Sequence, residues 1–119
     1  AGAAGMLKRQ VNLDRRLVLE EASSVSDGAG GNTEVWSALG VHWAQVDART
    51  GSGRAREFLT RSRLGLKITV RYAPQDSTTR PKPGQRFVEG TRIYAIDAVH
   101  ESGPRGGYLM CFAQEEVTT

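Results

Sequence analysis

Apolar and polar residues alternate along the second half of the chain. The clearest case is residues 66–72, where the alternating apolar side chains are those of Leu66, Ile68, Val70 and Tyr72. A period of two is typical of a β-strand with one buried and one polar face. Similar patterns, separated by turns at Gly90 and 102–107, predict further strands over residues 85–89, 91–101 and 108–113. The second half is therefore expected to form three or four antiparallel strands.

The first half holds two more strand regions, separated by a stretch rich in Ser and Gly. Residues 13–22 place Leu13, Leu17 and Leu19 on one side, although a helix is also compatible with this segment. Residues 23–32 predict a loop, because glycines such as Gly28, Gly30 and Gly31 favour tight turns.

The second of these strand regions, residues 34–49, changes its apolar face along its length. The apolar positions shift from Val41 and Trp43 to Ala44, Val46 and Ala48. This shift indicates either a β-bulge or a strand buried on both faces.

Two long segments lie outside these strands. Residues 73–84 form a polar loop rich in Pro and Thr, whereas residues 54–64 are ambiguous. In the second segment, Ala55, Phe58 and Leu59 have the spacing of a helical face, but a ragged strand followed by a loop fits equally well. The last strands carry apolar residues on both faces, so their sheet must close on itself or be covered. We therefore predict a mainly all-β fold: a small antiparallel β-barrel or sandwich with long loops and, in the helical alternative, one short helix.

Length and composition are those of one ordinary globular domain. The chain has 119 residues, of which 39% are hydrophobic and 24% charged, and this length leaves room for a single core. No apolar run approaches the roughly 20 residues that a membrane-spanning helix needs, so no membrane partner is expected. We expect residues 1–6 to be a disordered remnant of cloning, and residues 7–119 to be the domain.

The basic residues are clustered, and the net charge is +3. One cluster contains Arg54, Arg56, Arg61 and Arg63, and the other contains Arg80 and Lys82. Such clusters favour either a solvated or subunit-facing surface or proximity to DNA. The aromatic residues that usually accompany basic residues in single-strand binders are not evident in the sequence.

No motif indicates catalysis, a cofactor or a metal site. Cys111 is the only cysteine and stands in an apolar strand, so it is expected to be a small buried side chain rather than a nucleophile. With two histidines and no Cys/His cluster, a zinc site is not expected. The glycines near Asp27 do not lead from a strand into a helix, which argues against a phosphate-binding loop. The chain is therefore not expected to be an enzyme.

The order of several short sequence pieces resembles the phage head–tail joining family, whose members are also called head–tail adaptor, head-closure or stopper proteins. In the first half the pieces are Leu17–Leu19, the glycine-rich stretch before Trp36, Trp43–Val46 and Arg56–Leu59. In the second half they are Ile68–Tyr72, Arg86–Phe87, the Gly90–Ile96 hairpin and the acidic pair Glu115–Glu116. Members of this family occur in long-tailed phages, prophages and gene transfer agents.

The resemblance implies a β-barrel that assembles, in six or twelve copies, into a ring of the head–tail connector. It implies that this ring closes the DNA-filled head and offers the tail a docking surface within the virion or phage-like particle, which is assembled in the bacterial cytoplasm. The implied partners are copies of the chain itself, the portal-side adaptor, the tail terminator and packaged DNA bound without base recognition. The isolated protein is expected to be a monomer.

Residue roles follow from the same resemblance and from the pattern. DNA-facing candidates are Arg54, Arg56, Arg61 and Arg63, or Arg80 and Lys82. Candidate anchors of the core or of a subunit interface are Trp36, Trp43, Phe58, Arg71, Tyr72 and Tyr94. A small nucleic-acid-binding barrel of the OB or Sm-like kind is the alternative function.

Overall fold

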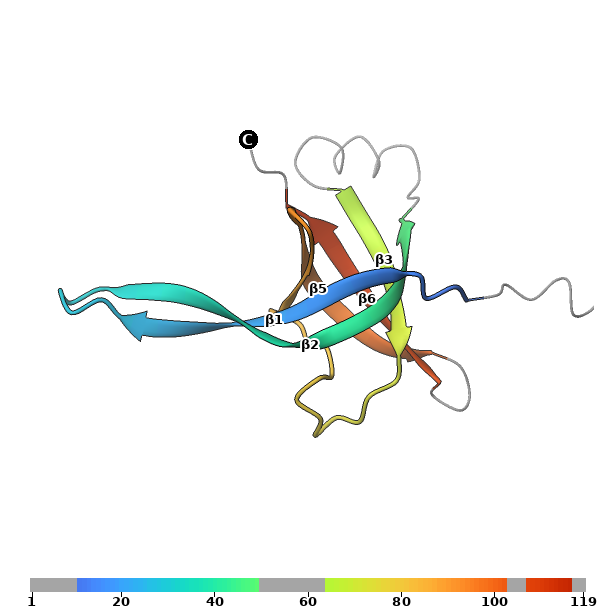
Figure 1. Cartoon of the computed structure of the whole chain (residues 1–119), viewed down its shortest axis with the longest axis horizontal. Coiled ribbons are helices and arrows are strands. Elements are labelled where there is room, and N and C mark those ends of the chain that lie inside the picture. Colours follow the sequence, from blue (N-terminus) through green and yellow to red (C-terminus); the bar gives the residue numbers. More distant parts are fainter. Residues whose placement is uncertain (1–10, 50–63, 103–106, 117–119) are drawn as a thin grey trace, which may run out of the picture.

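The described part of the chain is a closed antiparallel β-barrel (Figure 1). A computed structural model describes residues 11–49, 64–102 and 107–116. Within these ranges the strands are β1 (Arg15–Ser26), β2 (Asn32–Ala48), β3 (Leu64–Arg71), β4 (Arg86–Glu89), β5 (Arg92–Ser102) and β6 (Tyr108–Glu115). Their order around the barrel is β1-β2-β3-β6-β5-β4, and pairing of β4 with β1 closes it. The predicted all-β class is confirmed, while the candidate helix lies outside the described residues except for Leu64.

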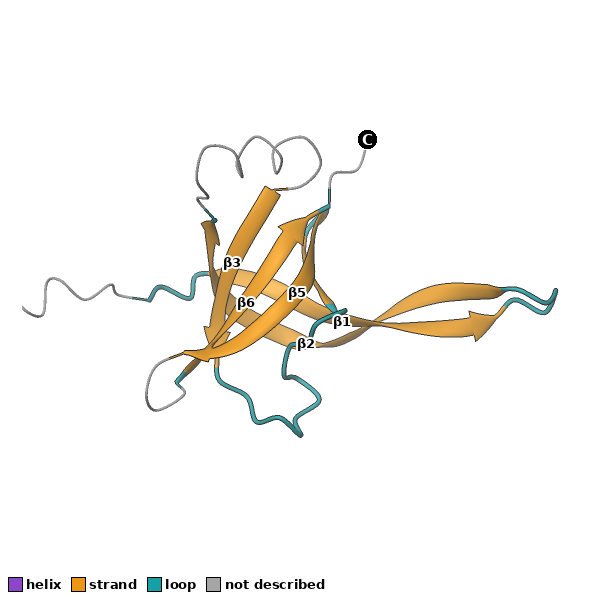
Figure 2. Ribbon diagram, turned by 180° about the vertical axis from the view of Figure 1, so that it is seen from behind, coloured by secondary structure: helices purple, strands orange, loops and turns teal. Residues whose placement is uncertain are grey.

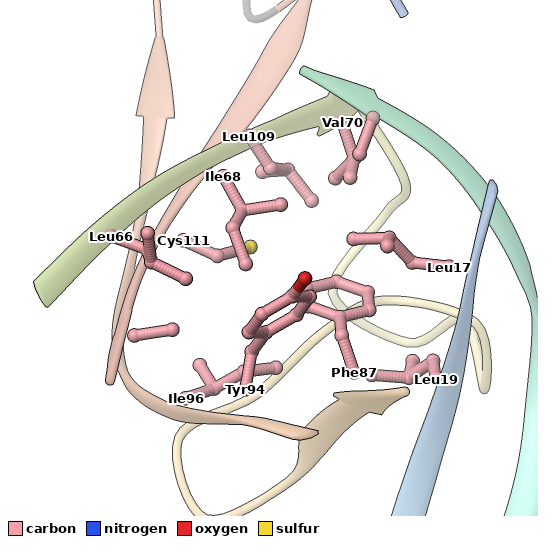
Figure 3. Packing of buried hydrophobic residues seen from close by; sticks show 12 residues of the cluster. Leu17, Leu19, Leu66, Ile68, Val70, Phe87, Tyr94, Ile96, Leu109 and Cys111 are labelled. Carbon is pink, nitrogen blue, oxygen red and sulfur yellow. The ribbon is translucent and has the colours of Figure 1, made fainter. Parts of the chain in front are cut away.

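Twelve buried side chains fill the barrel (Figure 3). All six strands contribute, the short β4 through Phe87 alone, and the twelve residues are Leu17, Leu19, Ala44, Leu66, Ile68, Val70, Phe87, Tyr94, Ile96, Leu109, Cys111 and Ala113. The alternation over residues 66–70 therefore predicted the inner face of β3 correctly. Tyr72 does not continue that face, because it lies beyond the end of β3 and is 41% exposed.

The apolar residues on both faces of β5 are explained by a bulge. Ile96 pairs with Ala113 and Ala98 pairs with Phe112, so Asp97 has no partner on β6. Tyr94 and Ile96 point inward before the bulge, and Val99 packs against the core after it. An extra residue reverses the alternation, so inward positions change from even to odd numbers.

A second bulge lies in β2, but not where the sequence predicted it. Leu19 pairs with Gly40 and Glu20 pairs with Ala38, which leaves Leu39 as the extra residue. Beyond it, Ala44 faces the core and Trp43 is 53% exposed. The predicted shift between Trp43 and Ala44 was wrong because it counted a large aromatic residue as buried, whereas this residue lies on the outer wall.

The loop predicted for residues 23–32 was also wrong. β1 and β2 continue beyond the barrel as a two-stranded ribbon, which we call the arm (Glu20–Ala38), and only Asp27–Gly31 form its turn. The arm projects from the barrel as the long blue and cyan hairpin in Figure 1, and Figure 2 shows it from behind. Its strands lack an apolar alternation because they have no core to face, and they are held together mainly by backbone pairing.

Two of the other connections follow the sequence prediction, while residues 103–106 of the predicted turn at 102–107 lie outside the described residues. Residues 73–84 form the predicted loop, and Gly90 adopts the positive φ angle (61°) that the tight turn between β4 and β5 requires. Cys111 is a buried free thiol, as predicted. In the described ranges there is no helix long and apolar enough to cross a membrane.

Candidate interaction surfaces

The arm is the first surface that the fold leaves without a covering element. Its turn is held by Asp27, whose Oδ1 accepts hydrogen bonds from the backbone amides of Ala29 (2.8 Å) and Gly31 (3.1 Å). Val25 is 49% and Val35 is 42% exposed. Both valines lie on the same face of the arm, because Val25 pairs with Thr33 and Ser23 pairs with Val35. An isolated two-stranded hairpin is only marginally stable in water, so this face is suited to a partner.

The base of the arm is fixed to the barrel through Arg86 of β4. The Arg86 guanidinium donates a hydrogen bond to Glu20 Oε1 at 2.8 Å, and its central carbon lies 4.0 Å from the ring centroid of Trp36. A guanidinium over an indole ring gains cation–π attraction. Trp36 was predicted to be a core or interface anchor. It is partly buried beneath Arg86, on the face of the arm opposite to Val25 and Val35.

The second surface is a row of residues across the outer wall of the barrel. Arg16 of β1 pairs with Trp43 of β2, and Arg71 of β3 pairs with Tyr108 of β6. Because Ala44 pairs with Val70, the register places Arg71 beside Trp43. We call Arg16, Trp43, Arg71 and Tyr108 the cationic row. Its first three members are exposed, and Val41, 46% exposed, flanks Trp43 on β2.

A charged network closes one end of the barrel, and the sequence prediction missed it. Glu89 accepts hydrogen bonds from Arg15 Nε (2.6 Å) and from the hydroxyl of Tyr94 (2.8 Å). The hydrogen bonds from Arg15 lower the pKa of Glu89 to about 2. Burial, followed by the bond to Glu89, raises the pKa of Tyr94 to about 12. Tyr94 is therefore a core residue with a satisfied hydroxyl, and the network joins β1, β4 and β5.

Two neighbouring charges extend this network to β6. Arg92 Nε donates a hydrogen bond to Glu115 Oε2 at 2.8 Å, and Arg92 Nη2 donates to Oε1 at 2.9 Å. The guanidinium lowers the pKa of Glu115. This bidentate pair joins the start of β5 to the end of the next strand, β6, and its two residues are 23 positions apart, which explains why no local motif predicted it.

The loop of residues 73–84 is packed against the barrel rather than extended. Arg80 is only 9% exposed, and its Nη1 donates a hydrogen bond to the carbonyl of Ala73 at 3.1 Å and lies 3.4 Å from Glu101 Oε2. His42 Nε2 donates to the carbonyl of Thr79 at 2.6 Å, and burial lowers the pKa of His42.

The predicted DNA-facing residues are thus placed in different ways. Arg80 is buried and hydrogen-bonded to the carbonyl of Ala73, whereas Lys82 is exposed at the surface. Arg54, Arg56, Arg61 and Arg63 lie outside the described residues, as does the candidate anchor Phe58.

The described residues offer little chemistry for catalysis. They contain no group of three or more His, Cys, Asp or Glu side chains that could hold a metal ion. Burial raises the pKa of the Cys111 thiol to about 12, which keeps it protonated and unreactive near neutral pH.

A small closed barrel with an exposed arm and an exposed cationic row is a fold suited to assembly through its surface. A sequence model of phage head completion proteins matches residues 8–116, so the chain belongs to the phage head completion protein family. The family resemblance inferred from the sequence pieces is therefore confirmed. A comparison with curated proteins finds no match.

Two solved structures are similar over almost the whole chain. One is a chain of the virion of a native gene transfer agent particle, with 48% identity and a TM-score of 0.71, and the match covers 94% of this chain and all of that one. The other is the solution structure of a protein from Shigella flexneri 2a, with 18% identity, a TM-score of 0.66 and the same coverage. The second similarity concerns the fold alone.

Proposed function

We propose that this protein is a structural component of the head–tail connector of a phage-like particle, where a ring of its copies closes the DNA-filled head and provides the surface to which the tail attaches. The proposed ring contains six or twelve copies and assembles in the bacterial cytoplasm. Its neighbours are a portal-side adaptor, a tail terminator and packaged DNA. No catalytic step is part of this role.

The observation that carries the proposal is the 48% identity to a chain of a gene transfer agent virion, over 94% of this chain. Membership in the head completion family supports the same role. The surfaces are compatible with it, because a ring needs two different complementary surfaces on each copy. The arm and the cationic row are two such surfaces.

Deletion of the gene in cells that produce the particle tests the proposal. We expect electron microscopy to reveal separate tails beside heads that have lost their DNA, and we expect the wild-type gene, supplied in trans, to restore joined particles. The matched control is a gene with an early stop codon, which must fail to restore them. Normal joined particles in the deletion strain would refute the proposal.

A second candidate function is a small nucleic-acid-binding barrel. The cationic row favours it, because Arg16 and Arg71 alternate with the aromatic residues Trp43 and Tyr108, and single-strand binders combine basic and stacking side chains in this way. Steeply salt-dependent binding of the isolated protein to a generic oligonucleotide, lost in the Trp43→Ala variant, would support this candidate.

A further inference from the structure

The arm carries only negative charge. Its strands and turn contain Glu20, Glu21, Asp27 and Glu34, and no Lys or Arg occurs anywhere between Leu17 and Ala48. Glu20 is neutralised by Arg86. Glu21 lies on the same face as Val25 and Val35, because it pairs with Ser37 in the same register. This valine face (Glu21, Val25, Val35) is therefore an apolar patch with a carboxylate at its edge.

The cationic row has the complementary chemistry. No ion pair joins Arg16 or Arg71 to any other residue that the structure describes. In the strand register Trp43 lies between Arg16 and Arg71 and, with Val41, it presents an exposed apolar area on the same wall. The row thus offers an apolar centre with positive charges on both sides.

The arm and the row of one molecule cannot meet. Val41 pairs with Val18 of β1, which lies seven residues before Val25 in the same strand. At about 3.3 Å per residue, this distance is about 23 Å. The arm also points away from the barrel wall, as Figures 1 and 2 show from opposite sides. The same geometry lets the arm reach about 20 Å beyond the barrel, far enough to lie over a neighbouring barrel.

We propose that the valine face of the arm of one copy docks on the cationic row of the next copy. Glu21 would then lie near Arg71 or Arg16, and Val25 and Val35 would cover Trp43 and Val41. This inference rests on the proposed ring, since it names the contact between adjacent subunits. The contact is heterologous, so it joins copies head to tail and closes when the rotation between them closes.

A second copy fits the row better than nucleic acid does. The arm and the row are present in equal number in every assembly of this chain, and their charges are opposite. Charge complementarity of this kind fixes the register of an interface and suppresses incorrect partners. A phosphate backbone on the row would approach the acidic arms of adjacent copies and be repelled by them.

Cysteine cross-linking in purified particles tests the contact. The variant Val25→Cys/Val41→Cys places one thiol on the valine face and one beside Trp43, without removing a charge. Its thiols are too far apart within one chain to pair, because a disulfide needs Cα atoms within about 7 Å. The native Cys111 is buried, so it does not contribute. Mild oxidation is expected to give covalent multimers on a non-reducing gel.

The matched control is Ser24→Cys/Val41→Cys. Ser24 lies next to Val25 on the arm but on the opposite face, as its pairing with Glu34 requires. We expect at least about tenfold fewer multimers from this control, because its thiol faces away from the row. Equal cross-linking by both variants would overturn the assigned face of the arm.

A charge exchange provides an independent readout. Arg71→Glu is expected to lower the yield of DNA-filled, tailed particles by about tenfold or more, since it places like charges at the contact. Adding Glu21→Lys is expected to restore the yield. Both positions are exposed, and equal thermal melting of the purified variants confirms that the fold is intact.

The outcomes separate this inference from the proposed function. Joined particles that contain the protein but give no Val25→Cys/Val41→Cys multimers would overturn the inference and leave the proposed function standing. Loss of oligonucleotide binding in Arg71→Glu, without any such multimers, would assign the row to nucleic acid and also overturn the inference. Particles that never contain the protein would overturn both.

Discussion

Replacing Glu89 with glutamine is expected to destabilise the barrel near neutral pH and to have little effect in acid. The Glu89 carboxylate joins three strands, because it accepts hydrogen bonds from Arg15 of β1 and from Tyr94 of β5. The Arg15 hydrogen bonds are the main cause of its lowered pKa of about 2. A glutamine amide keeps one acceptor oxygen but loses the negative charge, so the attraction to Arg15 is largely removed.

The sign and size of the effect follow from the pKa. The pKa of Glu89 lies at about 2 in the folded protein against 4.5 for the free group, so its stabilisation is complete above about pH 4.5 and is lost as the pH falls towards about 2. The difference corresponds to at most about 3 kcal/mol. The side chains of Arg15 and Glu89 are 35% and 23% exposed, and solvent screening reduces the expected loss to about 1–2 kcal/mol.

Urea denaturation across this pH range measures the effect. At about pH 7 the free energy of unfolding of Glu89→Gln should be about 1–2 kcal/mol below that of the wild type, and the two values should converge near pH 2. Glu34→Gln is the matched control, because Glu34 is exposed on the arm and forms no ion pair with a described residue. A difference that stays constant with pH, or an equal loss in the control, would refute the reasoning.

Three further predictions concern the core, the base of the arm and the thiol. Phe87→Ala should lower the free energy of unfolding by about 3–5 kcal/mol in urea titrations, because Phe87 is fully buried in the barrel; a loss below about 1 kcal/mol would contradict this packing. Arg86→Ala should shift the fluorescence of Trp36 to longer wavelength in a Trp43→Phe background, since it uncovers the indole ring; an unchanged spectrum would contradict the stacking. Cys111 should react with a thiol reagent only at the rate of unfolding, and rapid labelling of the native protein would contradict its burial.

Much of the barrel was predictable from the sequence because strands that face a core must alternate. Leu66, Ile68 and Val70 were placed correctly for this reason, and so were Leu17 and Leu19. The apolar residues on both faces of the last strands also predicted that the sheet closes or is covered. A bulge obeys no such local rule, because the extra residue is defined by its partner strand. The bulge in β2 was therefore expected in the correct strand but at the wrong residue.

The candidate surfaces were harder to predict because they depend on contacts between distant residues. Trp43 stands in an apolar context, and only the pairing with Arg16 shows that it faces outward between charges. Arg80 belongs to a basic cluster in the sequence, yet its guanidinium donates hydrogen bonds to the carbonyl of Ala73 and to the carboxylate of Glu101. One signal for the arm was present in the sequence, namely the absence of Lys and Arg from Leu17 to Ala48. This absence distinguishes the acidic arm from the rest of the chain, which carries the basic residues.

The bulge at Leu39 determines which side chains the arm presents. In a regular ladder continued from the Leu19–Gly40 pair, Val25 would pair with Glu34 and Ser24 with Val35, so the two valines would lie on opposite faces. Trp36 would then leave the face that carries Glu20 and lose its place beneath Arg86. With Leu39 as the extra residue, Val35 joins Val25 on one face, while Trp36 on the other face is fixed by Arg86. The same residue that interrupts the alternation therefore creates the valine face and fixes the opposite face to the barrel, which is the arrangement that the proposed docking on a neighbouring copy requires.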